Sequence, residues 1–174
     1  PRGRALGAAW YLPEERQITT KEQMLDEMCA TLGGRAAEDL FLNRISTGAM
    51  NDLERVTKQA YGMIAYLGMS DKLPNLCYYN NEEYSFNRPY SEKTAELIDT
   101  EVKNMVNEQY ERAKKILSEH REGHNQLAQL LIDKEVIFAE DVERIFGKRP
   151  WASRSEEIMA AKESQELSLI HISE

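Results

Sequence analysis

Two of the three histidines in this 174-residue sequence, His120 and His124, are four positions apart. On a helix that spacing places both imidazoles on one face, where they can share a zinc ion. A zinc-peptidase helix of the H-E-x-x-H type also needs a glutamate directly after its first histidine, to polarise the metal-bound water. Here Glu122 comes two positions after His120, about 200° round the helix. We therefore predict a solvated helix end followed by a turn at this point, and not a metal site.

Two carboxylates beside glycines are the other candidates for chemistry. Asp52 follows a loop that contains Gly48, at the start of a helical pattern, and Glu38 follows the pair Gly33-Gly34. Taken by itself, an aspartate in the first turn of a helix complements the helix macrodipole, and Glu38 fits a charge on a helix surface. Residue types and spacing alone predict an acidic helical domain without a defined chemistry.

Helical periodicity predicts six segments that would position these side chains. The first segment begins at a capping box formed by Thr19 and Glu22 and ends at residue 32. The other five cover residues 35–42, 51–67, 92–119, 124–133 and 139–146. Gly68 is placed to end the third segment, and the double glycine indicates close backbone packing or a kink. Residues 5–12 alternate like a short strand. The predicted fold class is mainly α, with one short edge strand near the N-terminus.

Composition excludes several classes of partner. The chain has 22 Lys and Arg against 30 Asp and Glu, a formal net charge of −8. This balance argues against nucleic acid as a partner, because phosphate contacts need clustered cations. The net negative charge also argues against binding to an anionic bilayer. No apolar run approaches the roughly 20 residues of a membrane span.

The last part of the chain is predicted to lie outside the folded domain. From about Trp151 the sequence becomes polar and loses periodicity, so we divide it into a domain over residues 1–150 and a disordered tail over 151–174. Residues 167–174 resemble translated sequencing-adapter read-through, and we expect them to be non-native.

Six separated blocks resemble the FtsH-type ATP-dependent zinc metalloproteases. The blocks are residues 1–7 (PRGRALG), 11–15 (YLPEE), 32–38 (LGGRAAE), 46–53 (STGAMNDL), 67–70 (LGMS) and 90–92 (YSE). They occur in the family's order and extend the likeness to about Gly147. The resemblance implies that residues 1–150 are the C-terminal portion of a zinc metallopeptidase domain.

By this resemblance Asp52 is a zinc ligand, and Glu38 orients a ligating imidazole from outside the coordination sphere. An alternative for Glu38 is a place on the helix surface. The family's H-E-x-x-H helix is missing, so two ligands and the general base are expected upstream of Pro1, about 25 residues before it. We expect this chain alone to be inactive and to bind zinc weakly.

The resemblance also implies a larger assembly. It points to a homo-hexameric, membrane-anchored enzyme of protein quality control that degrades unfolded or misfolded proteins, with ATP used by an upstream module. The anchor would place the peptidase domain on the cytoplasmic side of a bacterial inner or plasma membrane, or at an organelle membrane in a eukaryote. The rival interpretation is a non-catalytic acidic helical interaction module that kept the fold without the metal.

The predicted strand gains a role by the same resemblance. Gly7, Ala8, Ala9 and Trp10 would bind an extended substrate by β-strand addition, through main-chain hydrogen bonds. The alternative is an ordinary strand that covers the helices.

Overall fold

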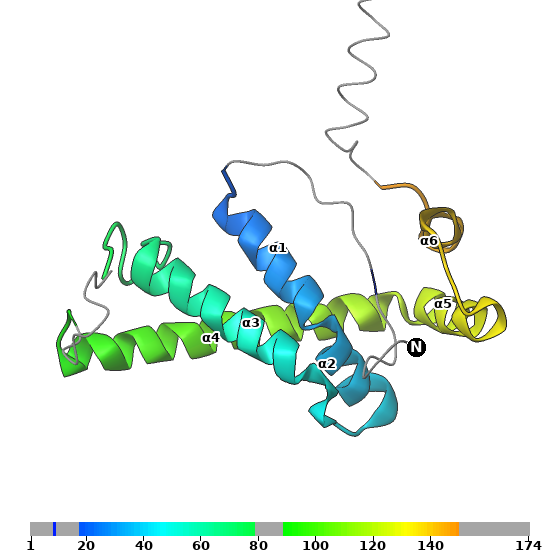
Figure 1. Cartoon of the computed structure of the whole chain (residues 1–174), viewed down its shortest axis with the longest axis horizontal. Coiled ribbons are helices and arrows are strands. Elements are labelled where there is room, and N and C mark those ends of the chain that lie inside the picture. The colour runs from blue at the N-terminus through cyan, green and yellow to red at the C-terminus, as the bar shows by residue number, and fades with distance from the viewer. Residues whose placement is uncertain (1–8, 10–17, 79–88, 150–174) are drawn as a thin grey trace, which may run out of the picture. The chain divides into compact units, whose positions relative to one another are not determined.

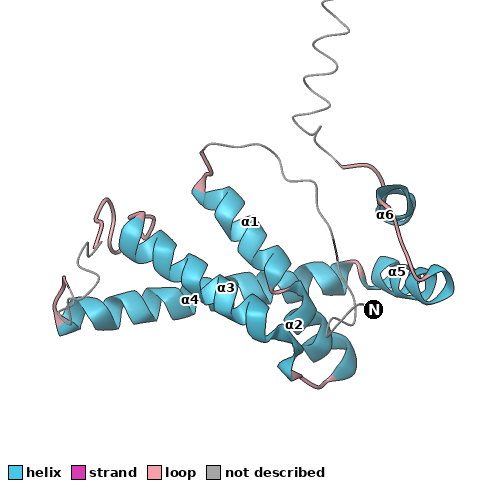
Figure 2. Cartoon of the chain, viewed as in Figure 1, coloured by secondary structure: helices cyan, strands magenta, loops and turns pink. Residues whose placement is uncertain are grey.

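The computed structural model describes Ala9, residues 18–78 and residues 89–149. It forms two compact units, one of residues 19–128 and one that combines residues 1–18 with 129–174. The described helices are α1 (Lys21–Thr31), α2 (Gly33–Ala37), η1 (Glu38–Leu42), η2 (Thr47–Ala49), α3 (Met50–Tyr61), η3 (Gly62–Tyr66), α4 (Glu92–Glu119), α5 (Arg121–Lys134) and α6 (Ala139–Phe146). Over these ranges the β structure amounts to an isolated bridge between Met69 and Pro74, and Figure 2 is almost entirely helix and loop. The predicted mainly α fold class is confirmed.

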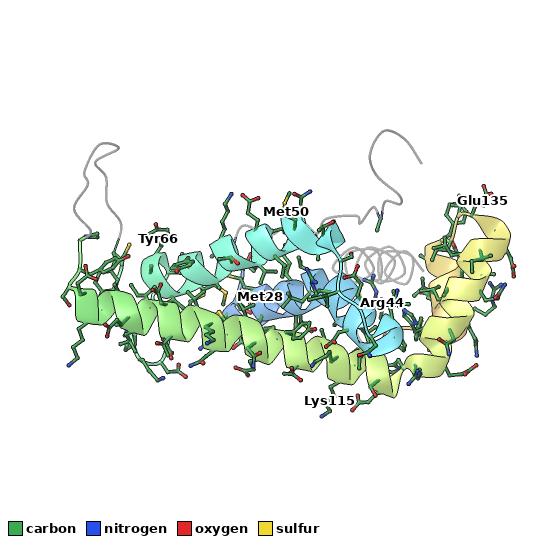
Figure 3. The ribbon with its side chains drawn as sticks, turned by 90° about the horizontal axis from the view of Figure 1, so that it is seen from below. Met28, Arg44, Met50, Tyr66, Lys115 and Glu135 are labelled. Atoms are coloured by element: carbon green, nitrogen blue, oxygen red, sulfur yellow. The ribbon has the colours of Figure 1, made fainter. Side chains whose placement is uncertain are left out.

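Apolar faces of four helical elements build the core of the 19–128 unit. α4 runs the length of this unit, and α1, α2 and α3 pack against it (Figure 1). The largest fully buried side chains are Met28, Leu32, Val56, Met63, Ile64 and Ile98. Met28 lies among the packed helices, whereas Lys115 points away from them on the outer side of α4 (Figure 3). Most apolar residues that recur at helical spacing thus lie on buried or half-buried faces, although Leu67 and Ile116 are 54% and 42% exposed.

The capping box of α1 lies one residue later than predicted. Thr20, and not Thr19, is the N-cap: its hydroxyl accepts the Gln23 N–H at 3.3 Å, and the Gln23 side chain accepts the Thr20 N–H at 3.0 Å. The sequence holds two overlapping boxes, Thr19 with Glu22 and Thr20 with Gln23. Either one satisfies the free backbone groups of a first helical turn, so the local pattern did not decide between them.

The double glycine marks a kink and not a close contact. The helix is interrupted at Leu32, between α1 and α2, although the Leu32 N–H still bonds to the Met28 carbonyl at 3.0 Å. Among the described residues, a Cβ at Gly33 or Gly34 would meet nothing within 4 Å. The alternative of close backbone packing is wrong. α2 then continues into η1, a π-helical turn, over the segment predicted at 35–42.

The later helices agree with the predicted segments. α4 starts at the Ser91 cap and covers the predicted range, and α5 and α6 match the two short helices. In the unit that contains α6, Asp141 accepts the Phe138 N–H at 3.1 Å and bonds to Lys134 and Arg144. These contacts hold the pKa of Asp141 below its ordinary value, with the backbone bond from Phe138 as the largest cause.

Parts of the predicted N-terminal strand and tail lie outside the described residues. In the segment 5–12 only Ala9 is described, and it is exposed and in no helix or strand. Gly7, Ala8, Trp10 and the range 150–174 are not described, so the strand and the disordered tail stay predictions. Within 18–78 and 89–149, no helix has both the length and the apolar character needed to cross a bilayer.

Gly68 and Gly34 should respond oppositely to alanine. Gly68 has φ +60°, and an added Cβ would lie 2.9 Å from the Asn75 nitrogen, so Gly68→Ala should lower the free energy of unfolding by at least about 1–2 kcal/mol. Gly34 is helical with open space around it, and Gly34→Ala should raise that free energy by about 0.5–1 kcal/mol. Urea unfolding of the two variants tests this, and equal effects would contradict the kink and the cap described above.

Candidate functional site

Asp52 lies in the first turn of α3 with its side chain exposed. Within the described part of the chain it makes no hydrogen bond and no ion pair. The unpaired backbone N–H groups of that first turn favour negative charge beside them. The carboxylate is therefore accessible to solvent and not shared with another described side chain, so its oxygens are available to bind a cation.

The loop before α3 determines where Asp52 lies. η1 ends at Asn43, which has φ +48° and turns the chain back on itself. Ser46 is extended, with φ −120° and ψ 176°, and is the N-cap of η2, which leads directly into α3. Ala49 at the junction is buried, whereas Gly48 has little room, since a Cβ there would lie 3.3 Å from the Ser46 hydroxyl.

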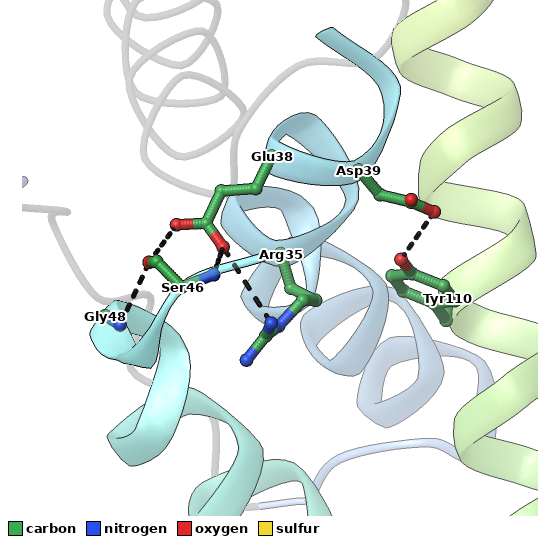
Figure 4. Close-up of polar contacts among 6 residues, drawn as sticks. All are labelled: Arg35, Glu38, Asp39, Ser46, Gly48 and Tyr110. Carbon is green, nitrogen blue, oxygen red and sulfur yellow. Dashed lines mark hydrogen bonds and ion pairs between the residues drawn. The ribbon is translucent and has the colours of Figure 1, made fainter. Parts of the chain in front are cut away.

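Glu38 holds this loop from η1. One carboxylate oxygen accepts the Ser46 N–H at 3.0 Å, and the other accepts the Ser46 hydroxyl (Figure 4). The same hydroxyl accepts the Gly48 N–H at 3.1 Å, and Arg35 lies 3.9 Å from Glu38 Oε2. The hydrogen bonds from Ser46, first the hydroxyl and then the backbone, lower the pKa of Glu38 below its ordinary value, and Arg35 adds to this effect.

These contacts limit what else Glu38 can bind. An ionised carboxylate can accept about four hydrogen bonds. The two donors of Ser46 and the guanidinium of Arg35 occupy three of these positions. Glu38 is half-buried and faces the loop, so the helix-surface alternative describes it incompletely. Its role in orienting an imidazole stays a prediction. Sequence reasoning missed the bond to Ser46, although the Ser-Thr-Gly spacing signals a serine cap.

A second polar contact fixes η1 to α4. The Tyr110 hydroxyl donates to Asp39 at 2.9 Å (Figure 4). Lys114 lies 3.6 Å from the same Asp39 oxygen and 4.8 Å from the Tyr110 ring centroid. Burial raises the pKa of Tyr110, and the bond to Asp39 raises it further. No sequence signal pairs these residues, since 71 positions separate Asp39 from Tyr110.

The histidine pair is placed differently from the prediction. α5 begins directly after His120, so His124 lies inside a helix and not in a solvated turn. The His124 ring stacks on Phe41 at 4.3 Å between centroids, with the planes 8° apart. The predicted helix end is present, since α4 ends at Glu119 and His120 lies in a turn, but α5 begins at Arg121, three residues before the predicted start at 124. Over the described ranges, no three His, Cys, Asp or Glu side chains are grouped closely enough to hold a metal ion.

Three exposed apolar side chains flank the same loop in the sequence. Leu42, Ile45 and Met50 are 67%, 66% and 68% exposed. Charged residues are the usual occupants of such positions. Helical periodicity did not single these residues out, because they lie outside the apolar faces of the helical segments on either side of the loop.

Comparison with known proteins places this site in a family. The model of "Peptidase family M41" matches residues 1–145. An ATP-dependent zinc metalloprotease FtsH of Parabacteroides distasonis is 70% identical over 165 residues, which cover 94% of this chain and 24% of that protein. The mitochondrial ATP-dependent zinc metalloprotease FTSH 10 of Arabidopsis thaliana is 47% identical over 154 residues, 88% of this chain and 19% of that protein. The mouse mitochondrial inner membrane m-AAA protease component AFG3L2 is 41% identical over 157 residues, 89% of this chain and 20% of that protein. The chain thus spans about a quarter or less of the length of these relatives.

Glu38 should make the stability of the chain depend on pH. Because its pKa is lowered on folding, its contribution is present above the ordinary glutamate value of 4.5 and is lost as pH falls through the lower folded value. Glu38→Gln should therefore destabilise the chain at pH 7, and its difference from wild type should shrink below pH 4.5. Chemical unfolding at several pH values measures this, with the exposed Glu96→Gln as the control. A constant difference between Glu38→Gln and wild type at every pH would contradict the assignment.

Proposed function

The chain belongs to peptidase family M41, and from that premise we propose that it is the C-terminal portion of the peptidase domain of an ATP-dependent zinc metalloendopeptidase. The observation that carries the proposal is the 70% identity to a bacterial FtsH over 94% of the chain. The match of the family model to residues 1–145 supports the same conclusion. The reaction is hydrolysis of peptide bonds in protein substrates.

Asp52 is the residue of this chain that would bind the zinc. A catalytic zinc site takes three protein ligands, and a carboxylate oxygen is a normal third ligand beside two imidazoles. An exposed, unpaired carboxylate at a helix N-terminus fits that role. Over the described ranges no three His, Cys, Asp or Glu side chains are grouped to hold a metal ion, and by the family resemblance the two imidazoles and the general base come from another part of the complete protein. When bound, zinc supplies a water whose pKa is lowered to about 7.

The wider biology is proposed from the family resemblance. Unfolded or misfolded proteins are the substrates, an ATPase module elsewhere in the complete protein uses ATP, and the assembly is a homo-hexamer. Membrane association is supported by the mouse relative, which is named as a component of a mitochondrial inner membrane protease. The FtsH relative at 70% identity is bacterial, and the placement of the peptidase domain on the cytoplasmic side of a bacterial membrane is proposed from the family resemblance alone.

Gly7, Ala8, Ala9 and Trp10 are proposed as the substrate-binding edge. An extended peptide that pairs with this segment gains main-chain hydrogen bonds whatever its sequence, which suits an enzyme that degrades many proteins. The small side chains of the first three residues leave room for such an approach. Ala9 is exposed, which the role requires.

Removing the Asp52 carboxylate tests the zinc role. In the complete protein, Asp52→Ala should lose bound zinc and ATP-dependent casein cleavage, because a two-imidazole site holds the metal poorly. Zinc content by atomic emission and casein cleavage measure the two effects.

Asp71→Ala is the matched control, since Asp71 is an exposed aspartate with one surface ion pair to Lys21. It should retain zinc and activity. Full zinc content in Asp52→Ala would refute the ligand assignment, and an active enzyme without Asp52 would favour a different site.

Proline substitutions test the substrate edge. Consecutive N–H groups of a strand point to opposite sides, so one of the variants Ala8→Pro and Ala9→Pro should remove a hydrogen bond to the substrate and reduce casein cleavage, while zinc content stays normal. Ala9→Gly keeps the N–H and should cleave casein like wild type. Normal turnover in both proline variants would refute strand addition here.

A further inference from the structure

We propose that Ser46 is a positioning residue for Asp52, which sets the direction of the carboxylate without touching it. The inference rests on the proposed zinc role of Asp52. It assigns to a single hydroxyl the task of holding the start of α3 at a fixed place relative to η1.

The hydroxyl of Ser46 acts as donor and as acceptor at the same time. It donates its one proton to Glu38 Oε1 and accepts the Gly48 N–H at 3.1 Å, while the backbone N–H of the same residue bonds to Glu38 Oε2 at 3.0 Å. Bonds to an ionised acceptor are about twice as strong as neutral ones. Ser46 thus ties the loop both backward to η1 and forward to η2 (Figure 4).

α3 has no cap of its own that could replace this contact. Its N-cap residue is Ala49, whose side chain makes no capping hydrogen bond. η2 is only three residues long and runs directly into Met50. Beside the buried Ala49 and the packing of Leu53 against the core, the Ser46 cap of η2 is the polar contact that fixes the start of α3 relative to η1.

Asp52 depends on that turn because no other contact holds it. Its side chain is exposed and has no partner among the described residues, so its carboxylate follows the backbone of the first turn. Metal affinity is sensitive to such placement, and losing a residue that orients a ligand costs about 10–100-fold. The exposed neighbours Ile45 and Met50 offer no apolar packing that could fix the loop instead.

Ser46→Ala in the complete protein tests the inference. Zinc should bind about tenfold more weakly in competition with a chromophoric chelator, because the carboxylate is no longer held in place. Hydrogen exchange of a peptide spanning residues 43–50 should become faster, since the Gly48 N–H loses its acceptor. Ser46→Thr keeps the hydroxyl and should restore both properties.

Ser91→Ala is the matched control. Ser91 is also a serine N-cap, whose hydroxyl accepts the Thr94 N–H at 3.3 Å at the start of α4, so its loss destabilises a helix end without reaching the loop. Zinc affinity should stay at the wild-type value in this variant.

The possible outcomes separate the inference from the function on which it rests. If Asp52→Ala loses zinc and Ser46→Ala binds it like wild type, the positioning role is refuted and the zinc role stands. If Ser91→Ala weakens zinc as much as Ser46→Ala does, the effect is one of general stability and the positioning role is again refuted. Zinc retained in Asp52→Ala overturns both.

Discussion

Two hydrogen bonds from Ser46 to the Glu38 carboxylate close the loop that separates η1 from α3. Their donors are a hydroxyl and a backbone amide, and their acceptor is ionised, which makes them stronger than neutral hydrogen bonds. The loop has no apolar core of its own apart from Ala49. The Glu38 carboxylate is therefore the polar anchor of the loop between Asn43 and the first turn of α3, beside the apolar contact of the buried Ala49.

Glu38 can serve as an anchor because η1 is itself fixed. Asp39, the next residue, bonds to Tyr110 and faces Lys114 on α4, while Phe41 stacks on His124. Three successive contacts of η1 therefore point in three directions: to the loop, to α4 and to α5. A π-helical turn widens the helix locally and changes the angular spacing of its side chains, which suits a segment with several partners.

The core and the proposed metal ligand belong to separate parts of the fold. Met28, Val56, Met63 and Ile98 are buried between α1, α3, η3 and α4, and Asp52 lies outside this cluster. Burial of these side chains holds the helices together by the hydrophobic effect. The buried cluster is formed by apolar side chains, and the proposed zinc ligand lies on α3, which this cluster helps to hold in place.

The sequence by itself determined the helices, because helical spacing and caps are local. Six predicted segments correspond to described helices, and Gly68 ends its segment as its freedom at positive φ allows. Family likeness added Asp52, whose type and first-turn position are also local facts. The α1 cap is local too, but the sequence offers two overlapping boxes and only the structure shows that Thr20 with Gln23 is the one used. Only the tertiary structure decided that His124 stacks on Phe41 and that Glu38 turns to Ser46. Helical spacing does not relate these residues, because Glu38 and Ser46 meet only after the loop has turned, and Phe41 and His124 meet only after η1 and α5 have come together.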